Sequence, residues 1–195
     1  MKITPYNEIR PYLLTGDQLL CSGQSFVSWL IKRATFSDIS HVAKVFVSGD
    51  DVFVWESTSL GKGIDGVRMT LMSQWLAEYN GKVYLRHLRY DRDEAFYEAY
   101  RTTREDFKNK KYERKILQLI GAALPWRNKA DLTDVFCSEL TTEVDMRSGV
   151  LPRYKPHYLP ANEVVPSDYL PGRKIDDRMR WTVKPACFSE LIRIK

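Results

Sequence analysis

The sequence predicts a mixed α+β fold, built from a β-hairpin and several amphipathic helices. Residues 41–57 are rich in β-branched and apolar side chains on both sides of a turn, which is typical of a hairpin. Residues 91–107 and 136–146 repeat apolar side chains at helical spacing, which indicates helices with one buried face. The chain has 195 residues, of which 44% are hydrophobic, so we expect a single domain over residues 1–195.

Before the hairpin, the sequence indicates a strand and a helix. Residues 18–21 read as a short apolar strand that ends at Ser22-Gly23. Residues 25–34 follow as a helix with Ser25 as its N-cap and a stripe at positions 26, 29, 30 and 33 or 34. Gly16 and Asp17 close the N-terminal arm ahead of the strand.

The hairpin turn determines which residues face each other across its two strands. If Gly49-Asp50 is the tight turn, residues whose numbers add up to 99 are paired. Glu56 then lies opposite Ala43 and one diagonal step from His41, on the same face of the sheet. That diagonal spans about 7 Å between backbones, which permits a carboxylate to reach an imidazole.

The segments after the hairpin alternate between loop, helix and strand. We expect a glycine-bearing loop at 61–66, helices at 69–79, 91–107 and 117–124, and a strand at 83–88. Phe96, Tyr100 and Phe107 mark the buried face of the helix at 91–107. The basic run from Lys108 to Lys115 is expected to be solvated surface, and Pro125 is expected to end the helix before it.

A late helix places one cysteine in its first turn. Residues 131–134 offer several N-caps, and Gly149 with Pro152 supplies the end of the helix. Cys137 therefore lies at the positive end of the helix dipole, which favours the thiolate over the thiol. Cys21 and Cys187 are better explained as small packed hydrophobic residues, and a packed structural role is also the alternative for Cys137. From 151 to 174 the chain is rich in proline and tyrosine, and we expect an ordered loop.

A thiolate nucleophile needs a base that exchanges protons near neutral pH, and histidine suits that task. His87 lies within a predicted strand, and His157 lies among prolines and tyrosines with no evident partner. His41 begins a strand and has Glu56 on the same face, so Glu56 is predicted to orient it. The alternative is that Glu56 is an exposed strand residue, but the apolar run before it indicates burial and therefore a partner.

The charge, the cysteine content and the apolar segments of the chain indicate which partners and which compartment to expect. The formal charge of +5 arises from 30 basic and 25 acidic residues that are mixed along the chain, so nucleic-acid binding is unsupported, while an anionic lipid surface stays open as a partner. Three distant cysteines argue against a disulfide framework and fit a reducing compartment. With neither a secretory apolar segment nor a membrane span evident, we expect a cytoplasmic or virion-associated protein.

Four motifs occur in a characteristic order: Gly16-Asp17-Gln18-Leu19-Leu20, Ser40-His41-Val42-Ala43, Glu56, and Phe136-Cys137-Ser138-Glu139-Leu140. This order, histidine then acid then cysteine, resembles the circularly permuted papain-like cysteine peptidases and amidases of the NlpC-type superfamily, in their YiiX-like branch. The resemblance covers approximately residues 16–165, including Pro160-Ala161 after the cysteine helix. Residues 170–195 lie outside it as a C-terminal extension.

The resemblance implies a permuted papain-like fold, with a central antiparallel sheet or partial barrel packed against helices that include the cysteine helix. It implies that Cys137 attacks an amide or ester carbonyl, that His41 accepts and returns the proton, and that Glu56 orients His41. The expected substrates are a peptide, an N-acyl amino acid or a cell-wall peptide, and no cofactor or metal is expected. Lys44 is expected to place a charge close to the site. The substrate-binding residues we predict are Gln24, Ser40, Ser138, Tyr158 and Pro160.

Two other functions stay open at this stage. One is a catalytically inactive or non-enzymatic member of the same fold that binds a peptide, cell-wall fragment or lipid, because a fold does not establish activity. The other is a basic module that uses Lys108 to Lys115 on nucleic acid or anionic membrane, which the interspersed Glu113 disfavours. Metal sites, phosphate loops and serine hydrolases are disfavoured because their motifs are absent from the sequence.

Overall fold

The structure is a computed structural model of the whole chain, and it describes residues 2–58, 66–108, 110 and 136–195. Several predicted segments therefore lie outside the described residues. They are the loop at 61–65, most of the basic run, the helix at 117–124 with Pro125, and the N-cap candidates at 131–134.

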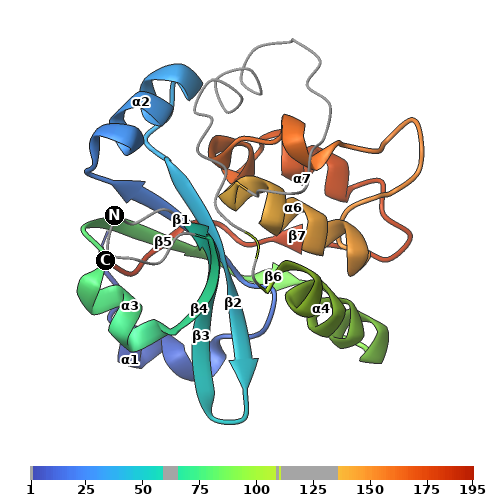
Figure 1. Cartoon of the computed structure of the whole chain (residues 1–195). Helices are drawn as coiled ribbons and strands as arrows, with labels where there is room; N and C mark the ends of the chain where they lie inside the picture. The colour runs from blue at the N-terminus through green and yellow to red at the C-terminus, as the bar shows by residue number, and fades with distance from the viewer. Residues whose placement is uncertain (1, 59–65, 109, 111–135) are drawn as a thin grey trace.

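An antiparallel sheet forms the centre of the molecule, as the α+β prediction requires (Figure 1). Its strands lie in the order β4-β3-β2-β1-β5-β8, and each neighbouring pair is antiparallel. Their bounds are β1 Gln18–Gly23, β2 His41–Ser48, β3 Asp51–Thr58, β4 Gly66–Leu71, β5 Gly81–Arg86 and β8 Ile192–Arg193. A second, two-stranded sheet pairs β6 (Leu88–Arg89) with β7 (Cys187–Phe188).

Helices cover both faces of the sheet (Figure 1). The α-helices are α1 Tyr6–Ile9, α2 Phe26–Thr35, α3 Met72–Glu78, α4 Glu94–Phe107, α6 Cys137–Arg147 and α7 Lys174–Met179. A short 3-10 turn occurs at Arg10–Tyr12. Two more, at Ala161–Glu163 and Pro166–Tyr169, lie within the loop expected from 151 to 174, which is therefore ordered mainly by turns. Helices α4 and α6 pack on one face of the sheet, and α1 and α3 pack on the other.

Alternation along β2 divides the core into two clusters. Val42 and Phe46 point to the face that α4 and α6 cover, and Ala43 and Val45 point to the opposite face. This division is what a strand buried on both sides requires, because successive side chains point in opposite directions. The predicted buried face of α4 is confirmed, since Phe96, Tyr100 and Phe107 are all buried.

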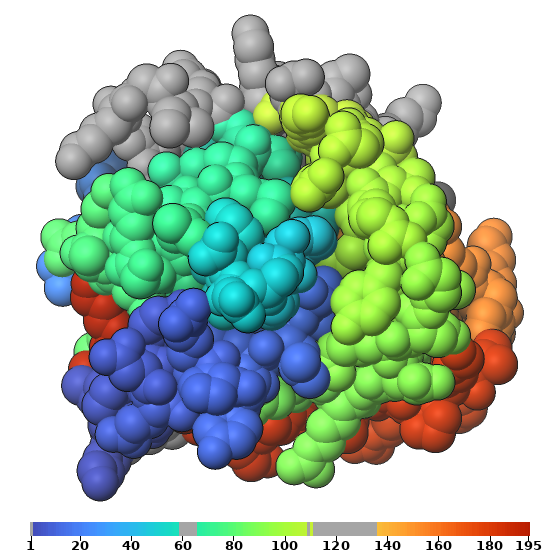
Figure 2. Space-filling model, turned by 90° about the horizontal axis from the view of Figure 1, so that it is seen from below, coloured from blue at the N-terminus to red at the C-terminus, as the bar shows by residue number. Residues whose placement is uncertain are grey.

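The predicted hairpin register is confirmed. Lys44 pairs with Trp55 and Ser48 with Asp51, so the numbers of paired residues add up to 99. Gly49 adopts a left-handed φ of 57°, which glycine tolerates in a tight turn. In Figure 2 the turn of the hairpin lies between the N-terminal arm and α4, and Arg10 donates a hydrogen bond of 2.8 Å to the carbonyl of Asp50 there.

The helix expected at 69–79 begins three residues late. Residues 66–71 form β4 instead, in which Met69 pairs with Trp55 and Leu71 with Phe53, and α3 begins at Met72. The edge of β3 supplies hydrogen-bond partners that local helical spacing does not reveal, so sheet pairing overrides it. The strand expected at 83–88 is likewise divided, because β5 ends at Arg86 and β6 begins at Leu88.

Helix α2 forms where predicted, but its expected stripe faces outward. Ser25 is the N-cap and accepts a hydrogen bond from the Ser28 amide at 3.1 Å. Phe26 and Trp29, which belong to the expected stripe, are 74% and 56% exposed. The helix instead packs through Ile31, on the side turned toward the cysteine helix.

The C-terminal residues that lie outside the family resemblance are part of the sheet. Strand β8 pairs with β5, and Ile3 from the N-terminal arm forms a parallel bridge to Arg193. In α7, Asp176 binds the buried Arg86 guanidinium through both carboxylate oxygens at 2.9 Å. Residues 170–195 therefore extend the central sheet and cover one of its buried cations.

Candidate active site

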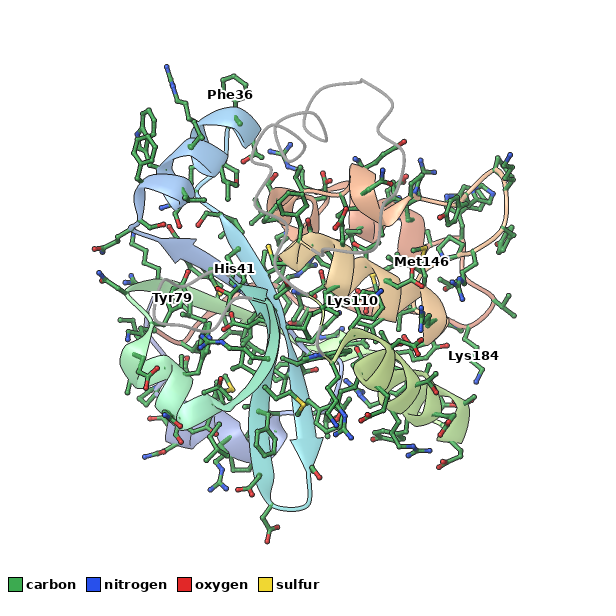
Figure 3. The ribbon with its side chains drawn as sticks, in the orientation of Figure 1. Phe36, His41, Tyr79, Lys110, Met146 and Lys184 are labelled. Atoms are coloured by element: carbon green, nitrogen blue, oxygen red, sulfur yellow. The ribbon has the colours of Figure 1, made fainter. Side chains whose placement is uncertain are left out.

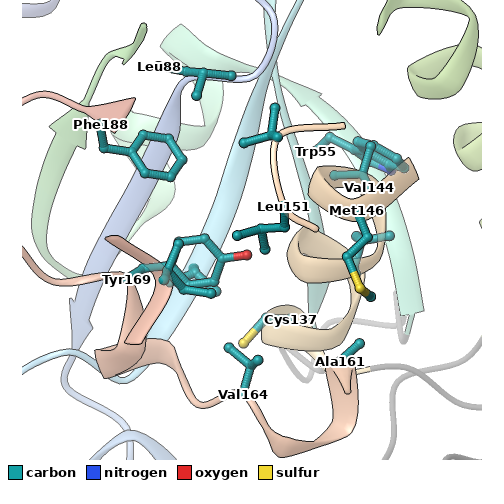
Figure 4. Packing of buried hydrophobic residues seen from close by; sticks show 14 of the residues in the cluster. Trp55, Leu88, Cys137, Val144, Met146, Leu151, Ala161, Val164, Tyr169 and Phe188 are labelled. Carbon is teal, nitrogen blue, oxygen red and sulfur yellow. The ribbon is translucent and has the colours of Figure 1, made fainter. Parts of the chain in front are cut away.

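The candidate site lies at one end of the sheet, where β1 and β3 end and where β2, β4 and β5 begin. Cys137 is the first residue of α6, as the sequence predicts, and is 3% exposed. The N-cap is Phe136, whose amide donates a hydrogen bond of 2.9 Å to the Glu139 carboxylate. Figure 4 shows Cys137 in this first turn, with Val164 and Ala161 beside it.

His41 and Glu56 meet as the register predicts. The Nε2 atom of His41 lies 2.7 Å from Oε2 of Glu56, and the two side chains are 14% and 1% exposed. Because Glu56 holds Nε2, the ring nitrogen left for other partners is Nδ1. Cys137 also forms a side-chain hydrogen bond with His41, so the imidazole joins the thiol to the carboxylate.

The second oxygen of Glu56 has partners that the sequence analysis missed. Arg68 donates to Oε1 from Nε at 2.9 Å and from Nη2 at 2.7 Å, and the Trp75 indole donates from Nε1 at 2.9 Å. Strand pairing places Arg68 directly opposite Glu56, and α3 brings Trp75 over the same face. The signal for Arg68 was hidden because residues 69–79 read as a helix, which left no strand beside Glu56.

Charges at this end of the sheet outweigh the effect of burial. Burial alone lowers the pKa of His41, but the charge of Cys137, its hydrogen bond, and Glu56 raise that pKa to about 10. Burial alone raises the pKa of Glu56, but His41 and then Arg68 hold that pKa below its usual value. The imidazolium and the carboxylate are therefore the favoured forms at neutral pH.

Tyr79 is another residue of the site that the sequence analysis missed. Its hydroxyl hydrogen-bonds the Cys21 thiol, and its ring stacks on Trp75 with centroids 4.7 Å apart. Burial and the charges of Glu56 and Cys137 raise the pKa of Cys21 well above its usual value. Cys21 is fully buried, so its predicted packed role is consistent with the structure. Figure 3 shows Tyr79 and His41 at the same end of the sheet.

The predicted substrate-binding residues are spread over different environments. Ser40 is buried, and its hydroxyl accepts from the Gly23 amide at 3.1 Å, so it joins β1 to the start of β2. Ser138 is fully buried next to Cys137, and among the described residues its hydroxyl has no hydrogen-bond partner. Gln24 is exposed, Tyr158 is 41% exposed and Pro160 is half-buried.

The expectation that Lys44 places a charge close to the site is wrong. Lys44 projects from the face of β2 opposite to His41, and its Nζ lies 2.7 Å from Oδ1 of Asp145, two turns along α6 from Cys137. Both side chains are fully buried. Strand residues an odd number of positions apart point to opposite faces, so the closeness of Lys44 to His41 in sequence does not bring its charge to His41.

The other two histidines contact residues away from the candidate site. Nδ1 of His87 lies 2.8 Å from the Asp17 carboxylate, which also accepts hydrogen bonds from the Leu88 amide and from Arg92. His157 stacks on Trp181 with ring centroids 4.2 Å apart. In the part of the chain that the structure describes, no cluster of three or more histidine, cysteine, aspartate or glutamate side chains is arranged to hold a metal ion.

The fold and the site together define an α+β protein with a buried cysteine, histidine and glutamate at the end of an antiparallel sheet. No protein-family model and no curated protein sequence matches the chain. Among solved structures it is similar to the crystal structure of metalloprotein yiiX from Escherichia coli O157:H7, with 22% sequence identity and a TM-score of 0.49. That similarity covers 69% of this chain and 66% of the yiiX chain, just under two thirds.

No helix within residues 2–58, 66–108, 110 and 136–195 combines the length and the apolar character that crossing a bilayer requires.

Proposed function

We propose that the protein is a cysteine hydrolase of the circularly permuted papain-like type, which cleaves an amide or ester bond through a thiol acyl-enzyme. The observation that carries the proposal is the position of the His41 ring, which hydrogen-bonds Cys137 and lies 2.7 Å from Glu56. The strand, strand and late-helix positions of His41, Glu56 and Cys137 fit the permuted order that the motifs resemble.

In the proposed reaction the Cys137 sulfur attacks the carbonyl carbon, and a carbon–sulfur bond forms as the carbonyl π electrons move to oxygen. The bond to the leaving amine or alcohol then breaks, and the His41 imidazolium gives its proton to that leaving group. Water, deprotonated by His41, attacks the thioester and releases the acid and the thiolate. Acylation leaves His41 as the neutral base that deacylation needs, and deacylation returns a proton to His41, which restores the thiolate and imidazolium and completes the cycle.

Arg68 and Trp75 have a supporting role in this proposal. They occupy Oε1 of Glu56 and leave Oε2 to His41, so the carboxylate stays ionised and fixed in orientation. A fixed carboxylate keeps the imidazole in one orientation and stabilises its protonated form. The backbone amide of Cys137, at the start of α6, supplies one oxyanion donor, for which about 3 kcal/mol is a typical contribution.

The substrate we propose is peptide-like or an acylated small molecule, such as an N-acyl amino acid or a cell-wall peptide. Among the predicted contacts, the buried Ser138 hydroxyl next to Cys137 supports a polar contact to the acyl group. Gln24, Tyr158 and Pro160 stay proposals for the more exposed part of the substrate.

Thiol alkylation provides the test. In a Cys187→Ser background, which removes the exposed cysteine, iodoacetamide is expected to label Cys137 once at neutral pH, as read by intact mass. His41→Gln is expected to slow that labelling about a hundredfold at pH 7, and Cys137→Ala is expected to remove turnover of any acyl substrate found by screening. Equal labelling of the His41→Gln variant over the whole pH range would contradict the proposal.

A second candidate function is a non-enzymatic binding protein of the same fold, and the burial of Cys137 favours it. With 3% of its surface exposed, Cys137 offers little access to a carbonyl in this conformation. A binding protein is expected to retain its ligand in the Cys137→Ala variant and to show no turnover in the wild type. Turnover that Cys137→Ala abolishes while binding persists separates the enzyme from the binding protein.

A further inference from the structure

Helix α2 has two faces with different surroundings. Its inner face packs Val27 and Ile31 against Phe136, the residue just before Cys137. Its outer face carries the stripe that the sequence pattern would place in a core. The helix therefore lies between solvent and the first turn of the cysteine helix.

The outer face is aromatic and strongly exposed. Phe26, Trp29 and Phe36 are 74%, 56% and 88% exposed, and the rings of Phe26 and Trp29 stack with centroids 5.8 Å apart. Positions 26, 29, 33 and 36 are three or four residues apart, so they fall on one side of the helix and its C-cap. Figure 3 shows Phe36 at the end of α2, directed away from the body of the molecule.

Cations accompany these rings. Arg33 is exposed within the same stripe, and Lys32 lies beside it with its Nζ 2.7 Å from the Gly23 carbonyl. Trp29, Lys32, Arg33 and Phe36 line a surface hollow of about 450 Å³ together with Ser37 and one acidic residue, Asp38. Exposed aromatic rings interleaved with cations on one helix face are typical of helices that lie in the headgroup region of a membrane.

We propose that the outer face of α2 docks the protein on an anionic phospholipid surface, with Phe26, Trp29 and Phe36 inserted among the acyl chains and Arg33 against the headgroups. Charge complementarity favours a lipid surface, because the chain carries a formal charge of +5, to which Arg33 on this face contributes. A protein partner or a second copy of this chain would be an outcome that contradicts the proposal. The inference concerns a surface separate from the acyl-transfer chemistry.

Vesicle co-sedimentation tests the docking. The wild type is expected to bind vesicles of equal parts phosphatidylglycerol and phosphatidylcholine, and to bind pure phosphatidylcholine at least about fivefold more weakly. Phe26→Ser combined with Phe36→Ser is expected to lower the partition coefficient on anionic vesicles by about tenfold or more, and Arg33→Glu by at least about fivefold. Added salt is expected to weaken the electrostatic part of the binding.

Matched variants elsewhere on the surface serve as controls. Tyr12→Ser removes an aromatic ring that is 71% exposed on the N-terminal arm, and Arg180→Glu reverses an exposed charge after α7. Both variants are expected to bind vesicles like the wild type. Binding that survives Phe26→Ser with Phe36→Ser, or that the controls lose equally, overturns the proposal.

Two further readouts separate the possible failures. Size-exclusion chromatography that shows a dimer broken by Phe26→Ser with Phe36→Ser overturns the lipid proposal in favour of a second copy. Cys137→Ala is expected to bind vesicles normally, since Cys137 is buried and is not part of the outer face of α2. Loss of vesicle binding with normal Cys137 alkylation contradicts only the docking, and normal vesicle binding with no His41-dependent alkylation contradicts only the hydrolase.

Discussion

Two buried ion pairs lie on opposite faces of strand β2, and the balance between burial and charge differs between them. On one face His41 meets Glu56, and the pKa of His41 is raised while that of Glu56 is lowered. On the other face Lys44 meets Asp145, and burial lowers the pKa of Lys44 and raises that of Asp145 in spite of their mutual attraction. Burial opposes the charged forms of both pairs, and only in the first pair do the surrounding charges and hydrogen bonds outweigh it.

The number of partners explains the difference. Glu56 accepts from His41, Arg68 and Trp75, and His41 also faces Cys137, so polar groups replace the water lost on burial. The Lys44–Asp145 pair is fully buried among aromatic rings, and its further polar contacts are neutral groups. A histidine that stays protonated beside a thiol suits acid–base chemistry, and a closed lysine–aspartate pair suits a fixed link between β2 and the cysteine helix.

The largest effect is expected when the closed pair is broken. Lys44→Ala leaves the Asp145 carboxylate buried without its cation, and we expect the free energy of unfolding to fall by about 3 to 5 kcal/mol in urea titrations. Replacing both residues, as Lys44→Met with Asp145→Leu, is expected to recover most of that loss because no charge stays buried. Stability unchanged in Lys44→Ala would show that the pair does not link β2 to α6.

A smaller effect is expected from Glu56→Gln, about 2 to 3 kcal/mol at pH 6 to 7. The folded pKa of His41, about 10, exceeds its ordinary 6.5, so the stability it contributes is fully present below pH 6.5 and is lost as pH rises through 10. Glu56 has a lowered pKa, so its contribution is present above its ordinary 4.5 and is lost at more acidic pH.

The difference between wild type and Glu56→Gln should therefore be largest near pH 6 and should shrink toward pH 10 and in acid. In parallel, the His41 ring resonances are expected to titrate at lower pH in the variant than in the wild type. An unchanged His41 titration would contradict the role given to Glu56.

The smallest effect is expected from Trp75→Phe, which removes the indole donor to Glu56 but keeps an aromatic ring on Tyr79. We expect a loss of about 1 to 2 kcal/mol in unfolding free energy. The His41 titration is expected to shift much less than in Glu56→Gln, since Arg68 still holds the same oxygen. A shift of the His41 titration as large as that in Glu56→Gln would show that Trp75, and not Arg68, is the main hydrogen-bond donor that stabilises the Glu56 carboxylate.

Local patterns predicted much of the site. A tight turn at Gly49-Asp50 sets the register of β2 and β3, so the pairing of His41 with Glu56 follows from counting residues. The first-turn position of Cys137 follows from the apolar spacing of its own helix. Both depend on interactions between residues close in sequence, which a single chain reveals.

Other features depend on contacts that sequence spacing does not record. The stripe of α2 has helical spacing, yet nothing in its pattern states that Val27 and Ile31, and not Phe26 and Trp29, contact the core. Arg68 reaches Glu56 only because β4 pairs with β3, and that pairing overrides a helical pattern at 69–71.

The sequence by itself determined the α+β class, the hairpin register and the helical start at Cys137, because turn chemistry and side-chain periodicity act over short stretches of chain. Only the tertiary structure decided that Cys137 meets His41, that Arg68 and Trp75 hold Glu56, and that Lys44 binds Asp145 on the opposite face. The physical reason is that the balance between burial and charge at each group depends on neighbours brought together from distant parts of the chain.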